Sequence, residues 1–206
     1  QNPAAICAGQ SLPNLSATVN NGGSITWYAT NPTLDPTSPV IGNGSTLFSA
    51  DYATFVNNGN APGNYTFWVV EMVNGCASQA AEVVVSILPT PALTVFQPAT
   101  ICAGQVLPSL SATSIDSIYW YNQDPDSNPG AILLGLGSIL PGTNLSGLIA
   151  DNTIPGIYTV WVQATNGSCN SLAQSITITI EAIPLLDPIP DLTLCALSTD
   201  LANIGL

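Results

Sequence analysis

The segment PGNYTFWV at residues 62–69 recurs as PGIYTVWV at residues 155–162. In the first copy Tyr65, Phe67 and Val69 alternate with a second set of side chains. Such alternation is the period of a β-strand, because successive strand residues point to opposite faces. The Pro-Gly pair that opens each copy is a turn signal. The segment therefore predicts a long strand that follows a turn, at the same point of two repeated units.

Other segments recur on both sides of this strand, in the same order. They are ICAGQ (6–10 and 101–105), LPNLSAT and LPSLSAT (12–18 and 107–113), WY (27–28 and 120–121), and NGC and NGSC (74–76 and 166–169). The offset of about 93 to 95 residues indicates tandem modules. We predict module 1 at 1–88, a proline-rich linker at 89–97 and module 2 at 98–182. Residues 183–206 are interpreted as a linker and the start of a truncated third module, and the alternative for 196–206 is a C-terminal tail.

The strand pattern within each module predicts the fold class. The run SITITI at 175–180 has the two-residue period of a strand, and no segment has the period and caps of a helix. Roughly seven short strands per module, with turn signals every 8–12 residues or so, are typical of an immunoglobulin-like sandwich. A jelly roll would need longer units. The prediction is all-β: tandem immunoglobulin-like β-sandwich modules with antiparallel sheets.

Repeated aromatic residues are assigned to the core or to a surface. Four are expected in the module cores: Trp27, Tyr65, Trp120 and Tyr158. The tryptophans resemble the core residue of the third strand, and the tyrosines resemble tyrosine corners, whose hydroxyl bonds the upstream backbone. Trp68 and Trp161 alternate with these inward positions. They either fill a core or form an interaction surface for a neighbouring protomer or a ligand.

The charged residues are of one sign. The chain has 12 acidic side chains, no Lys, Arg or His, and a net charge of −12. The composition therefore excludes a lysine Schiff base, a Ser-His-Asp triad and histidine metal ligands. A polyanion repels nucleic acids and anionic membranes, and no apolar run is long enough to span a bilayer. We expect no enzyme, no nucleic-acid partner and no membrane insertion.

The cysteines follow the repeat. We predict disulfides between Cys7 and Cys76 and between Cys102 and Cys169, while Cys195 has no partner within the chain. These spacings are too wide for CxxC metal or redox motifs. Free buried thiols are the alternative, and zinc is less favoured because no module has four ligands. Disulfides imply an oxidising compartment and hence export.

The acidic residues give no catalytic pair. Asp51 and Asp151 precede the Tyr strand in the two modules, which favours turn or capping roles over glycoside hydrolysis. We expect no cofactor. The one cofactor alternative is structural calcium, either at the DPDSN loop of residues 124–128 or between modules. The second site would use Asp187 and Asp191 with Asp116 or Glu181.

The combined pattern ICAGQxL…LSAT, WY, PGxYTxWV and NGCxS resembles the Ig-like repeats of giant cell-surface and secreted proteins of Bacteroidota, associated with type 9 secretion. The resemblance covers about residues 3–88 and 98–181 and the opening of a third unit. It implies an adhesin or extracellular filament, with no enzymatic residues. The chain departs from the usual repeat in lacking all cations and in its longer loops after the WY pairs.

Two functional hypotheses follow. The preferred one is a non-enzymatic structural and adhesive segment of an exported multi-module surface appendage or filament. It would act by extension and by self-association into a homo-oligomer, because a weakly charged surface repels its copies little. The alternative is a pair of carbohydrate-binding modules of a surface adhesin that recognise cell-surface glycans or other cells. Both place the protein at the cell surface or outside the cell.

Overall fold

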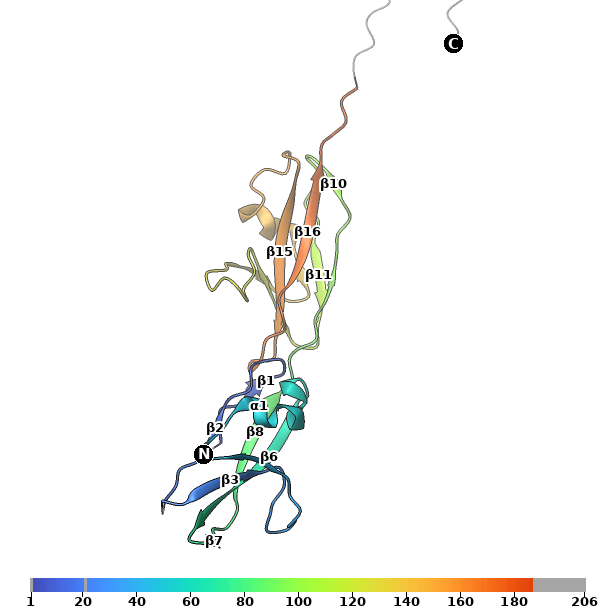
Figure 1. The fold of residues 1–206 in the computed structure, drawn as a ribbon. Coiled ribbons are helices and arrows are strands. Elements are labelled where there is room, and N and C mark those ends of the chain that lie inside the picture. The colour runs from blue at the N-terminus through green and yellow to red at the C-terminus, as the bar shows by residue number, and fades with distance from the viewer. Residues whose placement is uncertain (1, 21, 187–206) are drawn as a thin grey trace, which may run out of the picture.

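The computed structural model describes residues 2–20 and 22–186, and it places them in two β-modules stacked end to end (Figure 1). Each module has its own buried core, drawn from residues between Ile6 and Ile87 in module 1 and between Leu93 and Ile180 in module 2. The prediction of tandem immunoglobulin-like β-sandwiches is confirmed. None of the helices in the described part of the chain has the length and apolar character that crossing a membrane requires.

Module 1 is a large sheet packed on a small one. The large sheet has the order β1-β8-β6-β3-β4 with β7 paired to β6, and the small sheet pairs β2 with β5. The bounds are β1 Ile6–Cys7, β2 Leu15–Ser16, β3 Ser24–Tyr28, β4 Val40–Asn43, β5 Thr46–Leu47, β6 Gly63–Val73, β7 Cys76–Ala77 and β8 Ala81–Leu88. Trp27 of β3 and Leu47 of β5 bury into the same core, so the two sheets face each other.

Module 2 repeats this architecture. Its large sheet has the order β10-β16-β15-β12-β13, and its smaller sheet has the order β14-β11-β9. The bounds are β9 Thr94–Phe96, β10 Ile101–Cys102, β11 Leu110–Thr113, β12 Ser117–Tyr121, β13 Leu133–Leu136, β14 Ile139–Leu140, β15 Gly156–Thr165 and β16 Gln174–Glu181. The recurring ICAGQ, LSAT, WY and PGxYTxWV segments therefore contribute to equivalent strands in both modules.

Three features differ from the sequence predictions. The edge pairings β1–β8 and β10–β16 are parallel, because the first and last strands of a module run toward the same end, and all other pairings between the described strands are antiparallel. Residues 94–96 of the predicted linker form β9, which pairs with β11. Short helices also occur: α1 at Ser49–Tyr52, and the 3-10 segments η1 at Ala53–Gly59 and η2 at Gly142–Gly147.

The cores are built from the inward half of each strand pattern. Trp27 and Trp120 are fully buried, and their indole N–H groups donate to the carbonyl oxygens of Gly44 and Gly137, at 2.9 and 2.7 Å. On β16, Ile176, Ile178 and Ile180 all point into the core of module 2. Among the described residues, every buried side-chain nitrogen or oxygen has a hydrogen-bond partner.

The tyrosine at the start of β6 closes a local loop in module 1. The Tyr65 hydroxyl donates to the carbonyl oxygen of Ala61 at 2.9 Å, and its ring lies over Gly63. In module 2 the ring of Tyr158 lies over Gly156 in the same way and packs against the core. These contacts fix the turn from which the long strand begins.

Replacing Tyr65 with phenylalanine should lower the free energy of unfolding by about 1 kcal/mol, because the Ala61 carbonyl loses its donor while the ring stays in place. Chemical denaturation followed by tryptophan fluorescence measures this change. The matched control is Tyr28→Phe, since the hydroxyl of Tyr28 makes no hydrogen bond to the described residues, and its effect should stay within about 0.5 kcal/mol. Equal effects of the two changes would contradict a tyrosine corner.

Tyr52 at the end of α1 is the most deeply buried tyrosine, with an exposed fraction of 0%. Its hydroxyl donates to the carbonyl oxygen of Pro13, and burial raises the pKa of Tyr52 to about 12 from 10.0. The fold therefore favours the neutral phenol. This stabilisation is fully present below pH 10 and is lost as the pH rises toward 12.

We therefore expect the protein to unfold between pH 10 and about 12, with Tyr52 ionising only as the protein unfolds. Ultraviolet absorbance of tyrosinate, recorded together with circular dichroism, would show the two changes coinciding. In Tyr52→Phe the coupled step should disappear, whereas Tyr28→Phe should retain it. Complete tyrosine ionisation in a protein that is still folded would contradict the prediction.

Candidate functional site at the module junction

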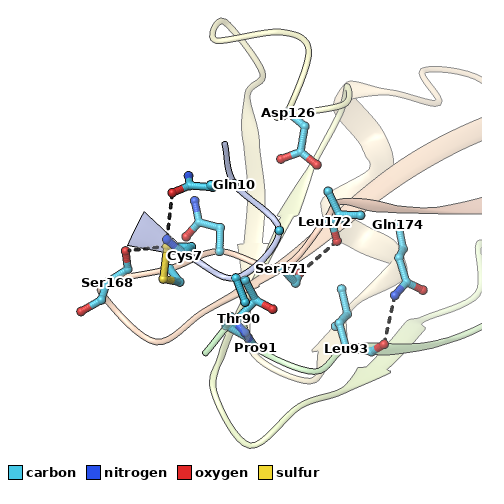
Figure 2. Close-up of a pocket in the computed structure, with 14 residues that line it drawn as sticks. Cys7, Gln10, Thr90, Pro91, Leu93, Asp126, Ser168, Ser171, Leu172 and Gln174 are labelled. Carbon is cyan, nitrogen blue, oxygen red and sulfur yellow. Dashed lines mark hydrogen bonds between the residues drawn. A yellow bond between two sulfur atoms is a disulfide. The ribbon is translucent and has the colours of Figure 1, made fainter. Parts of the chain in front are cut away.

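A disulfide joins the two modules where they meet. Cys7 of β1 is bonded to Cys169, with a Cα–Cα distance of 5.7 Å and a sequence separation of 162 residues (Figure 2). The junction is therefore crossed twice by covalent bonds, once by the chain after β8 and once by this bridge.

The predicted pairing of Cys7 with Cys76 is not the one in the structure. Cys7 lies beside Leu88 at the end of β8, whereas Cys76 lies on β7, before the start of β8. Strand β8 has eight residues, which at about 3.3 Å per residue places its ends about 23 Å apart. A disulfide requires Cα atoms within about 7 Å. The two cysteines of module 1 therefore lie at opposite ends of the module.

The predicted pair Cys102–Cys169 fails for the same reason. Cys102 lies beside Glu181 at the end of β16, and Cys169 precedes the start of that strand. Stacking the modules end to end brings Cys7, at one end of module 1, against Cys169, at the facing end of module 2. In the described residues Cys76 and Cys102 are exposed free thiols, and Cys195 lies outside those residues.

The ICAGQ motif holds Cys7 in place. The Cys7 N–H donates to Oε1 of Gln10 at 2.9 Å, and the Ala8 N–H donates to the Leu88 carbonyl oxygen at 2.8 Å. Gly9 has φ +87°, a conformation that favours glycine and completes the turn. The motif thus presents the cysteine at the end of the large sheet.

The NGSC turn between β15 and β16 holds Cys169. Oδ1 of Asn166 accepts hydrogen bonds from the N–H groups of Ser168 and Cys169, at 3.0 and 2.8 Å. Nδ2 of the same side chain donates to the carbonyl oxygen of Pro89 at 3.1 Å. Cys169 is 3% exposed. Asn166 therefore shapes the turn and also ties it to the segment that leaves module 1.

A carboxylate completes the junction on the side of module 2. Asp126 accepts hydrogen bonds from Nε2 of Gln163 and from the N–H of Ala173, both at 2.7 Å. Gln163 is buried and also donates to the carbonyl oxygen of Ser171. The Asp126 loop and the disulfide line one cavity of about 590 Å³ (Figure 2). The cavity also receives Gln10, Thr90, Pro91 and Leu172, so both modules contribute to its wall.

The DPDSN loop forms two side-chain-capped turns. Oδ1 of Asp124 accepts the Asp126 N–H at 3.0 Å, and Oδ1 of Asn128 accepts the Gly130 N–H at 2.9 Å. In module 1 the oxygens of Asn31 and Asp35 cap the equivalent turns. Of the two loop carboxylates considered for calcium, Asp124 is thus a turn acceptor, and Asp126 accepts the long-range hydrogen bonds from Gln163 and Ala173.

Within the described residues no three acidic or cysteine side chains converge on a metal position. The alternative between modules depended on Asp187 and Asp191, which lie outside the described residues. Glu181, at the end of β16, is exposed.

The two aspartates before the Tyr strands occupy capping positions. Asp51 accepts the Phe48 N–H at 3.1 Å, next to α1. Asp151 accepts both the hydroxyl and the N–H of Thr153, and these two bonds hold its pKa below 3.8. Both carboxylates thus accept hydrogen bonds within their own loops.

Trp68 and Trp161 lie half-buried on the outer face of the large sheets. Trp68 is directly opposite Tyr28 in the β3–β6 register, and Trp161 is opposite Tyr121 in the β12–β15 register. Each module therefore carries one Trp–Tyr pair on the face turned away from its core.

No protein-family model and no curated protein sequence matches this chain. Solved structures that align with it include the fibronectin(III)-like modules of CbhA from Clostridium thermocellum, at 15% identity, 88% of this chain, 91% of that chain and TM-score 0.34. A Ca²⁺-stabilised adhesin of an Antarctic bacterium that binds ice aligns at 13% identity, over 82% of this chain and 43% of that chain, with a TM-score of 0.30. The insect immune protein hemolin aligns at 16% identity, over 89% of this chain and 45% of that chain, with a TM-score of 0.34.

This chain spans less than half the length of the adhesin and hemolin chains. At these TM-scores the fold assignment rests on the strand topology described above.

Removing the bridge with Cys7→Ser and Cys169→Ser should leave both modules folded, because each has its own core, but should loosen their relative orientation. The chain-entropy model assigns about 5 kcal/mol to closing a loop of this length, so the melting temperature should also fall. Small-angle X-ray scattering and thermal melting measure the two effects. The matched control, Cys76→Ser with Cys102→Ser, should change neither. An unchanged scattering profile without the bridge would show that the disulfide does not restrain the junction.

Proposed function

We propose that this chain is a non-enzymatic structural and adhesive segment of an exported multi-module surface appendage or filament. The observation that carries the proposal is the Cys7–Cys169 disulfide, which joins one module to the next. Modules connected by a short chain alone reorient by default unless their interface is large. A second covalent link at the same junction opposes that motion. The bridge therefore suits a segment whose task is to extend.

Polar contacts at the junction support the same role. The Asn166 side chain bonds the Pro89 carbonyl oxygen, and prolines at positions 89 and 91 stiffen the connecting segment. With the disulfide, these contacts give three restraints within one short stretch. Figure 1 shows the result as two modules in line, with β7 at one tip and β10 at the other.

The disulfide also supports an extracellular location. Disulfides persist in oxidising surroundings and are rare where thiols are kept reduced. The sequence resemblance to Ig-like repeats of Bacteroidota surface proteins agrees with export. Adhesion is the role of one solved structure that aligns with the chain, and for this protein it remains part of the proposal.

Self-association is favoured by the surface. The chain has no cations, its only charged side chains are 12 acids, and several of those are occupied as turn acceptors. Large apolar side chains such as Leu34, Ile132 and Ile157 are exposed, at 82%, 63% and 73%. The net charge of −12 opposes contact between copies, so the exposed apolar groups are the feature of this surface that favours packing side by side.

A second candidate function rests on the outer-face aromatics. The Trp68–Tyr28 and Trp161–Tyr121 pairs recur at equivalent register positions. Half-exposed aromatic rings on a flat sheet face are suited to stacking against sugar rings. This observation favours glycan recognition as the alternative.

Sedimentation and electron microscopy over a range of concentrations test the two functions, using Cys76→Ser with Cys102→Ser and Cys195→Ser so that only non-covalent association is scored. The structural role predicts elongated particles that associate as concentration rises, and no signal on a glycan array. A strictly monomeric protein that binds glycans, with binding lost in Trp68→Ala and Trp161→Ala, would replace it with the lectin function. Phe48→Ala, at an exposed phenylalanine away from both pairs, is the control for that loss.

A further inference from the structure

The two free thiols of the described chain lie at opposite tips of the two-module unit. Cys76 is on β7 and Cys102 is on β10, and Figure 1 places these strands at the two ends. Cys102 is the repeat equivalent of Cys7, and Cys76 is the repeat equivalent of Cys169. Each tip therefore carries the repeat equivalent of one cysteine of the disulfide at the central junction.

The Cys102 tip is built like the Cys7 side of that junction. The Cys102 N–H donates to Oε1 of Gln105 at 2.8 Å, as Cys7 does to Gln10 at 2.9 Å. The Ala103 N–H donates to the Glu181 carbonyl oxygen at 2.8 Å, and Gly104 has φ +82°. Cys7 and Cys102 are thus held by the same type of turn, each beside the end of the last strand of its own module.

The Cys76 tip is built like the Cys169 side. In module 1 the N–H and carbonyl of Glu71 bond Ser78, two residues after the cysteine. In module 2 the N–H and carbonyl of Ala164 bond Ser171 in the same way. The module 1 turn is one residue shorter, with Asn74 and Gly75 at φ +50° and +81° as in a tight two-residue hairpin. Cys76 is exposed there, whereas Cys169 is covered.

Next to the Cys102 tip, none of the described residues covers an apolar segment whose equivalent is covered at the central junction. Ile87 and Ile180 occupy the same register position beside the first strand of their modules. Leu93, six residues after Ile87, packs against the core of module 2. Leu186, six residues after Ile180, is 94% exposed, and the neighbouring Leu185 is equally exposed. What covers Leu93 is the next module of the same type, so the fitting occupant at Leu186 is another such module.

We propose that the Cys102 tip is a docking face for a second copy of this chain. The end of the second copy that carries Cys76 would bind to it, and a Cys102–Cys76 disulfide would link the two chains. The inference rests on the proposed function, because it makes the central junction the repeating joint of an array. Docking would bring Cys76 to Cys102 in the way that stacking brings Cys169 to Cys7. It would also place Asn74 beside the segment that leaves module 2, in the position that Asn166 has beside Pro89 at the central junction.

Closing this bridge is an oxidation that needs a disulfide oxidant. The Cys102 thiolate attacks the oxidant's disulfide and releases one thiolate. The Cys76 thiolate then attacks the Cys102 sulfur of the mixed disulfide and releases the second thiolate. Two protein thiols thus give up two electrons and two protons, and the oxidant's disulfide becomes two thiols. A disulfide oxidoreductase of the exporting compartment has this chemistry, and oxidised glutathione supplies it in a test.

The test uses the full chain with Cys195→Ser, so that only the two tip thiols react. One sample carries Cys76→Ser and keeps Cys102, and the other carries Cys102→Ser and keeps Cys76. Each sample, and their equimolar mixture, is incubated with oxidised glutathione. Products are separated on non-reducing gels, and cross-linked peptides are identified by mass spectrometry after cleavage with chymotrypsin, since the chain has no site for trypsin.

Docking predicts a dimer only in the mixture, with Cys76 joined to Cys102. Homodimers in the separate samples at the same yield would show random coupling and overturn the proposal, and so would the absence of any dimer in the mixture. The matched control moves the thiol from Cys102 to Val106, which is 88% exposed, by Cys102→Ser with Val106→Cys. Mixed with the sample that keeps Cys76, this variant should lose the dimer.

The outcome separates this inference from the function beneath it. If the mixture gives no specific dimer while the Cys76→Ser, Cys102→Ser, Cys195→Ser protein still forms elongated, associating particles, the end-to-end bridge is wrong and the structural role stands. If those particles are absent as well, both fail.

Discussion

Strand direction constrains the whole molecule. In each module the first and last strands run in parallel toward one end, while the hairpin before the last strand turns at the other. A cysteine on the first strand and a cysteine on that hairpin are therefore held a full strand length apart and cannot meet within a module. Tandem stacking is what brings such cysteines together. The disulfide, the cavity beside it and the hydrogen bond from Asn166 to Pro89 all form where the stacked modules meet.

The absence of cations shapes how the molecule uses its acids. A carboxylate here has no Lys, Arg or His to pair with, so it accepts hydrogen bonds from backbone N–H groups and hydroxyls. Asp35 is stabilised by Thr37, Asp151 by Thr153, and both pKa values are lowered by these neighbours, chiefly through the threonine hydroxyl. Asp126 performs the same task across a longer distance, joining its loop to Gln163. Loop geometry thus rests on short-range hydrogen bonds, which salt screens far less than surface ion pairs.

Local pattern and repetition predicted the sandwich, the order of repeated segments and the burial of Trp27 and Trp120, because these follow from alternation along single strands. What sequence could not supply was the end of the module at which a residue lies. Cys7 and Cys76 share a module in sequence, yet the direction of β8 separates them. Asp126 was a calcium candidate because of the D-x-D-x-N pattern of its loop, and its hydrogen-bond partner Gln163 is 37 residues away, beyond the reach of a local pattern. Strand β9 was assigned to a linker because it follows two prolines and pairs only through tertiary contact with β11.

The bridge also decides how a mechanical load would pass through the molecule. Tension applied to the two chain ends reaches Cys7 from one side and Cys169 from the other, and between them it runs through two sulfur atoms. The polypeptide enclosed by the bridge, which includes most of both hydrophobic cores, lies outside the line of force. A pull of this kind can lengthen only the residues outside the bridge, before Cys7 and after Cys169, and the latter include the core strand β16. Covalent topology, more than the strength of either fold, then limits the extensibility of the unit.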